Sequence, residues 1–132
     1  MKNKMKEKTS SSLSKYDQNV LLPILMKGLE MKKGKENAVT GKGIVYGLRN
    51  AGLRIDERRV CRLINHIRTN DLVVGLMASN RGYYITSNEE ELIDYEKILL
   101  RREAALKNVR MSMQRQRRSM FVPVREKQPQ LF

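Results

Sequence analysis

The stretch from Thr40 to Thr86 places the tightest constraint on how this chain can fold. It holds two apolar runs at helical spacing, separated by a glycine turn at Gly52, and then two runs rich in β-branched and aromatic residues around a polar tip. The first helical run contains Ile44 and Leu48, and the second contains Val60, Leu63, Ile64 and Ile67. This order predicts a mainly α fold with a small β-hairpin, in which two helices meet at a turn and the hairpin follows.

Local signals set the expected ends of the two helices. Thr40 and Asp56 should each cap a helix, because their side-chain oxygens can accept a hydrogen bond from a free N–H of the first turn. Gly52 suits the left-handed conformation at a helix end, and Asn70-Asp71 should end the second helix. The three glycines between Gly41 and Gly47 weaken the first helix and are expected to allow close approach of a neighbouring helix.

A further helix is predicted before this stretch, from Asp17 onward. Its apolar positions are Val20, Leu21, Ile24, Leu25, Gly28 and Leu29. Ser14 or Asp17 should cap its start and Gly34 should end it. Pro23 leaves two alternatives: either the helix begins near Leu22, with the proline in its first turn, or it is kinked at the proline.

A long charged helix is predicted after the hairpin, from Asn88 to about Arg118. Ser87-Asn88-Glu89-Glu90 reads as a capping box. The apolar positions Leu92, Tyr95, Leu99, Leu106, Val109 and Met113 follow heptad spacing, which Arg102 interrupts. Two readings stay open: the helix packs back on the preceding domain, or it forms a short two-stranded coiled coil and makes the protein a homodimer.

The charge balance indicates a polyanionic partner. Lys and Arg number 27 against 14 Asp and Glu, for a net charge of +13. The basic residues are spread over several elements, so a membrane surface fits less well than nucleic acid. We expect a disordered basic arm at 1–13, a DNA-binding domain at 14–86, a long charged helix for possible dimerisation at 87–118 and a flexible tail at 119–132.

The second helix of the central stretch carries the candidate contact residues. Arg58, Arg62, Asn65 and Thr69 form one stripe opposite the apolar one, and Arg59 and His66 flank it. Arginine pairs bidentately with guanine and asparagine with adenine in the major groove, whereas a solvated surface more usually mixes Lys with Glu. The pattern therefore predicts a helix that reads duplex DNA.

The hairpin should add a second contact. It is predicted from the runs Leu72–Leu76 and Tyr83–Thr86, with one of Tyr83 and Tyr84 in the core and the other facing outward. At its tip, Ser79, Asn80 and Arg81 offer a cation and short hydrogen-bond donors to phosphate or to the minor groove.

Catalysis, cofactors and metals find little support in this sequence. Cys61 and His66 are single residues of their kinds, so one chain cannot assemble an ordinary Cys/His zinc site, and His66 has no recognisable triad partner. Cys61 lies beside the apolar stripe and is expected to act as a small hydrophobe. We expect a protein that is not an enzyme and binds no small-molecule ligand or cofactor.

Residues 41–86 resemble the winged helix-turn-helix domains of small bacterial and phage regulators. Gly43–Leu48 matches the first helix of the motif, Arg58–Arg68 the recognition helix and Ser79–Ile85 the wing, while no ligand-binding domain follows. The resemblance implies duplex DNA binding through Arg58, Arg62, Asn65 and Arg81. We therefore expect a sequence-specific DNA-binding protein of the cytoplasm, either a transcriptional regulator or a phage replication or accessory factor.

Two other functions remain open at this point. A virion or nucleoid component could coat nucleic acid without sequence preference through the same basic arms. An RNA-binding factor fits the charge but not the recognition helix, because A-form RNA hides its major groove.

Overall fold

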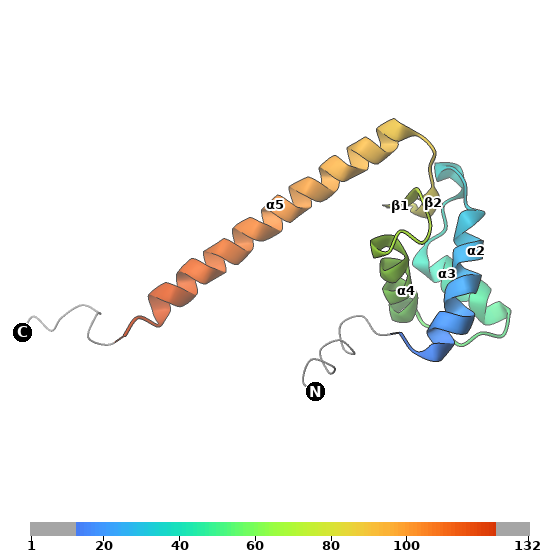
Figure 1. The fold of residues 1–132 in the computed structure, drawn as a ribbon, viewed down its shortest axis with the longest axis horizontal. Helices are drawn as coiled ribbons and strands as arrows, with labels where there is room; N and C mark the ends of the chain where they lie inside the picture. The colour runs from blue at the N-terminus through green and yellow to red at the C-terminus, as the bar shows by residue number, and fades with distance from the viewer. Residues whose placement is uncertain (1–12, 124–132) are drawn as a thin grey trace, which may run out of the picture. The chain divides into compact units, whose positions relative to one another are not determined.

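The computed structural model describes residues 13–123, so the expectations for residues 1–12 and 124–132 lie outside it. The fold is mainly helical, with a two-stranded antiparallel hairpin and a long C-terminal helix, as predicted (Figure 1). The elements are a π-helical turn η1 (Asp17–Leu21), α2 (Leu22–Glu30), a 3-10 turn η2 (Lys35–Asn37), α3 (Gly41–Asn50), α4 (Glu57–Thr69), β1 (Leu76–Ser79), β2 (Gly82–Ile85) and α5 (Glu89–Met120). Two units divide between Leu92 and Ile93.

The first helix accommodates Pro23 by changing its winding. Proline has no N–H and its ring would clash with the carbonyl four residues earlier in an α-helix. The chain instead forms the wider π-helical turn η1, in which the Leu22 N–H donates to the Asp17 carbonyl, and α2 follows with the proline in its first turn. Ser14 caps this start, since its Oγ accepts the Asp17 N–H at 3.0 Å.

The predicted end of α2 at Gly34 was wrong. The helix ends at Glu30, and the Lys32 carbonyl accepts the Ile85 N–H of β2 at 2.7 Å. Val39 then exchanges two backbone hydrogen bonds with Tyr83, at 2.8 and 3.0 Å. The chain between α2 and α3 therefore lines the free edge of β2, a long-range pairing that competes successfully with continuation of the helix.

The turn between α3 and α4 agrees with the prediction. Thr40 Oγ1 accepts the Gly43 N–H at 3.0 Å, and Asp56 Oδ1 accepts the Arg59 N–H at 2.8 Å. Gly52 has a φ of 87°, and the Leu53 N–H donates back to the Leu48 carbonyl at 2.9 Å. These bonds form the Schellman arrangement that closes a helix end, so the start of α4 is fixed to the end of α3.

The glycines of α3 do not all serve close packing. A Cβ at Gly41 would lie 3.3 Å from a carboxylate oxygen of Glu57 in α4, whereas a Cβ at Gly47 would meet nothing within 4 Å. The expectation of close helix approach was therefore wrong for Gly47.

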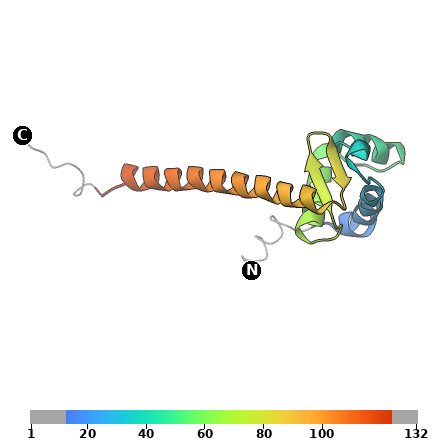
Figure 2. The same cartoon turned by 90° about the horizontal axis from the view of Figure 1, so that it is seen from above.

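The first strand of the hairpin lies further along the chain than predicted: it was expected at Leu72–Leu76 and spans Leu76–Ser79. β1 begins at Leu76, and Leu72–Gly75 forms turns instead of strand. Asp71 adopts a left-handed φ of 56°, and the Leu72 N–H donates to the Ile67 carbonyl, so the end of α4 uses residues that were expected in the strand. β1 and β2 then pair from Leu76 with Ile85 to Ser79 with Gly82, side by side as Figure 2 shows.

One core holds the unit up to Leu92 together. Its buried members come from η1, α2, α3, the turn after α3, α4, the segment before β1 and the start of β1: Leu21, Leu25, Leu29, Ile44, Ile55, Val60, Leu63, Ile64, Ile67, Val73 and Leu76. All four apolar positions predicted for α4 are buried in it. Tyr84 is buried, but Tyr83 is half-buried and packs against this core, so the expectation that one of the two would face outward was wrong.

The start of α5 differs from the predicted capping box. Asn88, and not Ser87, caps the helix: its Oδ1 accepts the N–H groups of Glu90 at 2.8 Å and Glu91 at 3.2 Å. Glu91 is thereby placed to accept the Tyr84 hydroxyl at 3.0 Å. From this cap α5 continues unbroken for 32 residues with none of its side chains buried.

Candidate nucleic-acid interface

The outer face of α4 is set by the burial of its inner face. Val60, Leu63 and Ile67 are each 0% exposed, so the helix cannot rotate about its axis without leaving the core. Arg58, Arg62, Asn65 and Thr69 all lie exposed on the opposite side, as their spacing predicted. The fold therefore presents this stripe outward in one orientation.

The two outer arginines of this stripe have no acidic partner within residues 13–123. Neither Arg58 nor Arg62 forms an ion pair or a side-chain hydrogen bond there, and the side chain of Asn65 is equally unengaged. Their donors are available to a partner from outside the chain. Arg68, at the edge of the same helix, does have an interaction within the protein.

Arg59 is held inside the protein instead of facing outward. Its Nε donates to Oδ1 of Asp17 at 2.8 Å, its Nη2 forms an ion pair with the same oxygen at 2.7 Å, and its guanidinium lies 5.6 Å from the centre of the Tyr16 ring. The Asp17 side chain is only 5% exposed, against 30% for Arg59. Arg59 therefore joins η1 to the first turn of α4, and its donors are largely taken.

The C-terminal end of the stripe also has internal partners. Thr69 Oγ1 donates to the Asn65 carbonyl at 2.9 Å, and the Asn70 amide lies 3.3 Å from His66 Nδ1. These bonds close the last turn of α4. The part of the predicted stripe that is free to meet a partner is thus Arg58, Arg62 and Asn65.

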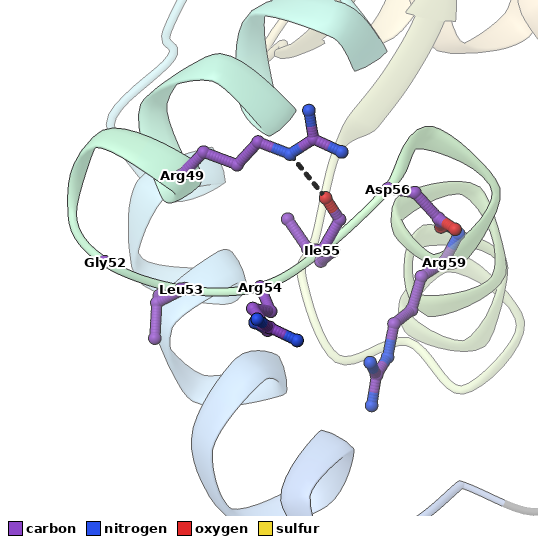
Figure 3. A pocket seen from close by; sticks show the side chains of 7 residues that line it. All are labelled: Arg49, Gly52, Leu53, Arg54, Ile55, Asp56 and Arg59. Carbon is purple, nitrogen blue, oxygen red and sulfur yellow. Dashed lines mark hydrogen bonds between the residues drawn. The ribbon is translucent and has the colours of Figure 1, made fainter.

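A shallow cleft of about 570 Å³ lies beside this stripe, at the turn between α3 and α4. Its lining consists of Arg49, Gly52, Leu53, Arg54, Ile55, Asp56 and Arg59 (Figure 3). Arg49 Nε donates to the Ile55 carbonyl at 2.9 Å, which braces the turn. The three arginines extend in different directions, so they add positive charge along the turn and do not form a cage around one small anion. Sequence reasoning had not included Arg49 or Arg54, although both flank the predicted glycine turn.

Hydrogen bonds within the turn hold the hairpin tip in one conformation. Ser79 Oγ accepts the Arg81 N–H at 3.2 Å and donates to the Gly82 carbonyl at 3.0 Å. Gly82 has a φ of 118°, and a Cβ there would overlap the Val39 carbonyl. Ser79 is therefore engaged within the turn, and Asn80 and Arg81 remain exposed at the tip.

Tyr84 has a structural role at the base of the hairpin. Burial raises the pKa of its hydroxyl above the ordinary value of 10.0, and the hydrogen bond to Glu91 and the charge of that carboxylate raise the pKa further. The neutral phenol therefore links β2 to the first turn of α5.

Three features of the described residues bear on other functions. No group of three or more His, Cys, Asp or Glu side chains within residues 13–123 is placed to hold a metal ion. Cys61 is exposed on α4, so the expectation that it would act as a small hydrophobe beside the core was wrong. Within the same range, no helix is long and apolar enough to cross a membrane.

Comparison of the chain with protein-family models, curated proteins and solved structures found no match.

Proposed function

We propose that this protein binds duplex DNA in a sequence-dependent manner, with the outer face of α4 in the major groove. The observation that carries the proposal is the uncompensated stripe of Arg58, Arg62 and Asn65 on a helix whose other face is locked in the core. A surface that served only solubility would gain from ion pairs with carboxylates, and within residues 13–123 no carboxylate pairs with these arginines.

The chemistry of the stripe fits base edges. The guanidinium groups of Arg58 and Arg62 can each donate two parallel hydrogen bonds to guanine, and the Asn65 amide can donate and accept at adenine. Arg59 is given no base contact, because its Nε and Nη2 already contact Asp17. Thr69 and Ser79 are excluded in the same way, by their bonds to backbone carbonyls.

The order of elements supports the same assignment. α3, the turn at Gly52, α4 and the hairpin follow one another as in a winged helix-turn-helix, and the edge of β2 is lined by the segment that precedes α3. Arg81 would contact the phosphate backbone from the hairpin tip, and Arg54 would do so from the turn. A transcriptional regulator and a replication or accessory factor share this mode of binding.

Selection of bound sequences from a pool of random duplexes tests the proposal. We expect an enriched motif for the parent protein, and a weaker or shorter motif for Arg62→Ala. Lys27→Ala is the matched control, because it removes one exposed positive charge from α2 and should leave the motif unchanged. A protein that binds tightly but enriches no motif would instead be a nucleic-acid coating protein, and the proposed sequence preference would be withdrawn.

A further inference from the structure

The helix α5 carries an apolar seam whose central members are exposed. Its heptad positions a and d are Leu92, Tyr95, Leu99, Arg102, Leu106, Val109, Met113, Gln116 and Met120. Within this α5 seam, Leu106 is 71% exposed, Val109 57% and Met113 53%. An unsupported helix with such an exposed stripe gains little from its own backbone bonds, because most helical stability in proteins comes from packing of the apolar face.

The charged residues that border the seam change sign along the helix. The e positions, which follow each d residue, are Glu89, Glu96, Glu103, Arg110 and Arg117. The border is therefore acidic along the first part of the helix and basic along the last part. The g positions on the other border are Glu91, Ile98, Ala105, Ser112 and Ser119, of which only the first is charged.

This order distinguishes between the two ways in which a second copy can pair with α5. In a parallel coiled coil, each g residue faces the e residue of the next heptad on the other helix, which here sets Glu91 against Glu96 and gives no attractive pair. In an antiparallel pair, e residues face e residues. Glu96 then faces Arg110 of the second copy, and Glu89 faces Arg117, twice each by symmetry.

We propose that the α5 seam binds α5 of a second copy of this chain in the antiparallel orientation, with the exposed Leu99 packed against the exposed Val109 of the second copy. In this register the acidic and basic ends of the two helices neutralise each other. The two Glu103 side chains meet near the centre of the pair, where Arg102 of each copy lies beside them and supplies the opposite charge. The proposal does not depend on DNA binding.

Disulfide trapping in the full-length chain tests the orientation. Leu99→Cys and Val109→Cys are made separately, each with Cys61→Ser to remove the exposed native thiol. The two proteins are mixed, allowed to exchange subunits and oxidised, and the covalent dimers are identified by mass. We expect the mixed dimer in large excess, because residue 99 lies opposite residue 109, about ten residues or 15 Å from its own counterpart. Disulfide formation by Leu99→Cys alone would indicate a parallel pair and overturn the proposal.

Charge reversal tests the same pairing without a covalent bond. Glu96→Lys and Arg110→Glu should each raise the dissociation constant of the dimer by about tenfold, since two attractive pairs become repulsive. An equimolar mixture of the two variants should recover a heterodimer of near-parental affinity. Asp94→Lys and Arg115→Glu are the matched controls, because both lie at c positions away from the seam. A monomeric mass of the parent at tens of micromolar in light scattering, or equal effects of the controls, would rule the pairing out.

Discussion

The ion pair between Asp17 and Arg59 should make an unusually large contribution to stability for a bond that involves a helix surface residue. The Asp17 side chain is 5% exposed, accepts a hydrogen bond from Nε of Arg59 and forms a close ion pair with Nη2. Replacing Arg59 with Met keeps most of the side-chain volume but leaves a buried carboxylate without its partner. Breaking a fully buried pair in this way costs about 3–5 kcal/mol.

The exposure of Arg59 lowers that figure for this protein. Because 30% of its side chain meets solvent, water can partly replace the guanidinium, and we expect the Arg59→Met variant to lose about 2–3 kcal/mol. Loss of the contact with the Tyr16 ring contributes about 0.5 kcal/mol of this. Asp17→Asn should lose about 1–2 kcal/mol, because the amide oxygen still accepts a hydrogen bond but no longer carries charge.

Urea unfolding followed by near-ultraviolet circular dichroism of the buried Tyr84 measures these losses. With a slope of about 1 kcal/mol/M, the midpoint for Arg59→Met should fall by about 2–3 M. The double variant Asp17→Asn, Arg59→Met should lose less than the sum of the single variants, by about 1–2 kcal/mol. Arg58→Met is the control, since its side chain is exposed and unpaired. Equal stability of the Arg58 and Arg59 variants, or additive losses in the double variant, would refute the structural role of the pair.

Four other outcomes follow from the same structure. Arg81→Ala should weaken all duplexes alike in a competition assay with matched and scrambled sequences, because a residue that contacts only phosphate carries no base preference. Gly82→Ala should lower stability by about 1–3 kcal/mol in urea, since its Cβ would overlap the Val39 carbonyl at a φ of 118°, and an unchanged midpoint would count against the observed turn. The folded-state pKa of Tyr84 is raised, so the stability that its neutral hydroxyl contributes is fully present below the unfolded pKa of about 10 and is lost as the pH rises through the folded pKa. Tyr84→Phe should remove this loss of stability when the free energy of unfolding is measured from pH 8 to 11. DNA affinity should fall with salt at a log-log slope of roughly −4 to −7, as four to eight phosphate contacts require, and a flat dependence would argue against an electrostatic interface.

The features that the sequence predicted correctly depend on short stretches of chain. Thr40 and Asp56 cap their helices because the hydroxyl or carboxylate and the N–H that it accepts lie three residues apart, within one turn. Gly52 takes its left-handed conformation for an equally local reason. The buried stripe of α4 follows from spacing alone, so the outward direction of Arg58 and Arg62 could be predicted as well.

The errors come from contacts between distant residues. Asp17 and Arg59 are 42 positions apart, so no local pattern indicates that Arg59 pairs with Asp17. The end of α2 was placed wrongly because backbone groups of Lys32 and Val39 bond to β2. The start of β1 is the exception: it was displaced by the nearby closure of α4, where the Leu72 N–H donates to the Ile67 carbonyl. The burial of Asp17 could not be predicted from the sequence either, since an aspartate near a helix start is normally an exposed cap.

Arg58 and Arg59 have different roles because they lie at different angles around the axis of α4. Arg58 and Arg59 are adjacent in sequence but about 100° apart around the helix axis, so one faces solvent while the other reaches Asp17 on η1. A substitution at either removes the same charge, and a purely electrostatic view of DNA binding would expect the same loss of affinity. The structure separates the two effects: Arg58→Met should weaken DNA binding in a protein of parental stability, whereas Arg59→Met should lower stability first and affect DNA binding only through the orientation of α4.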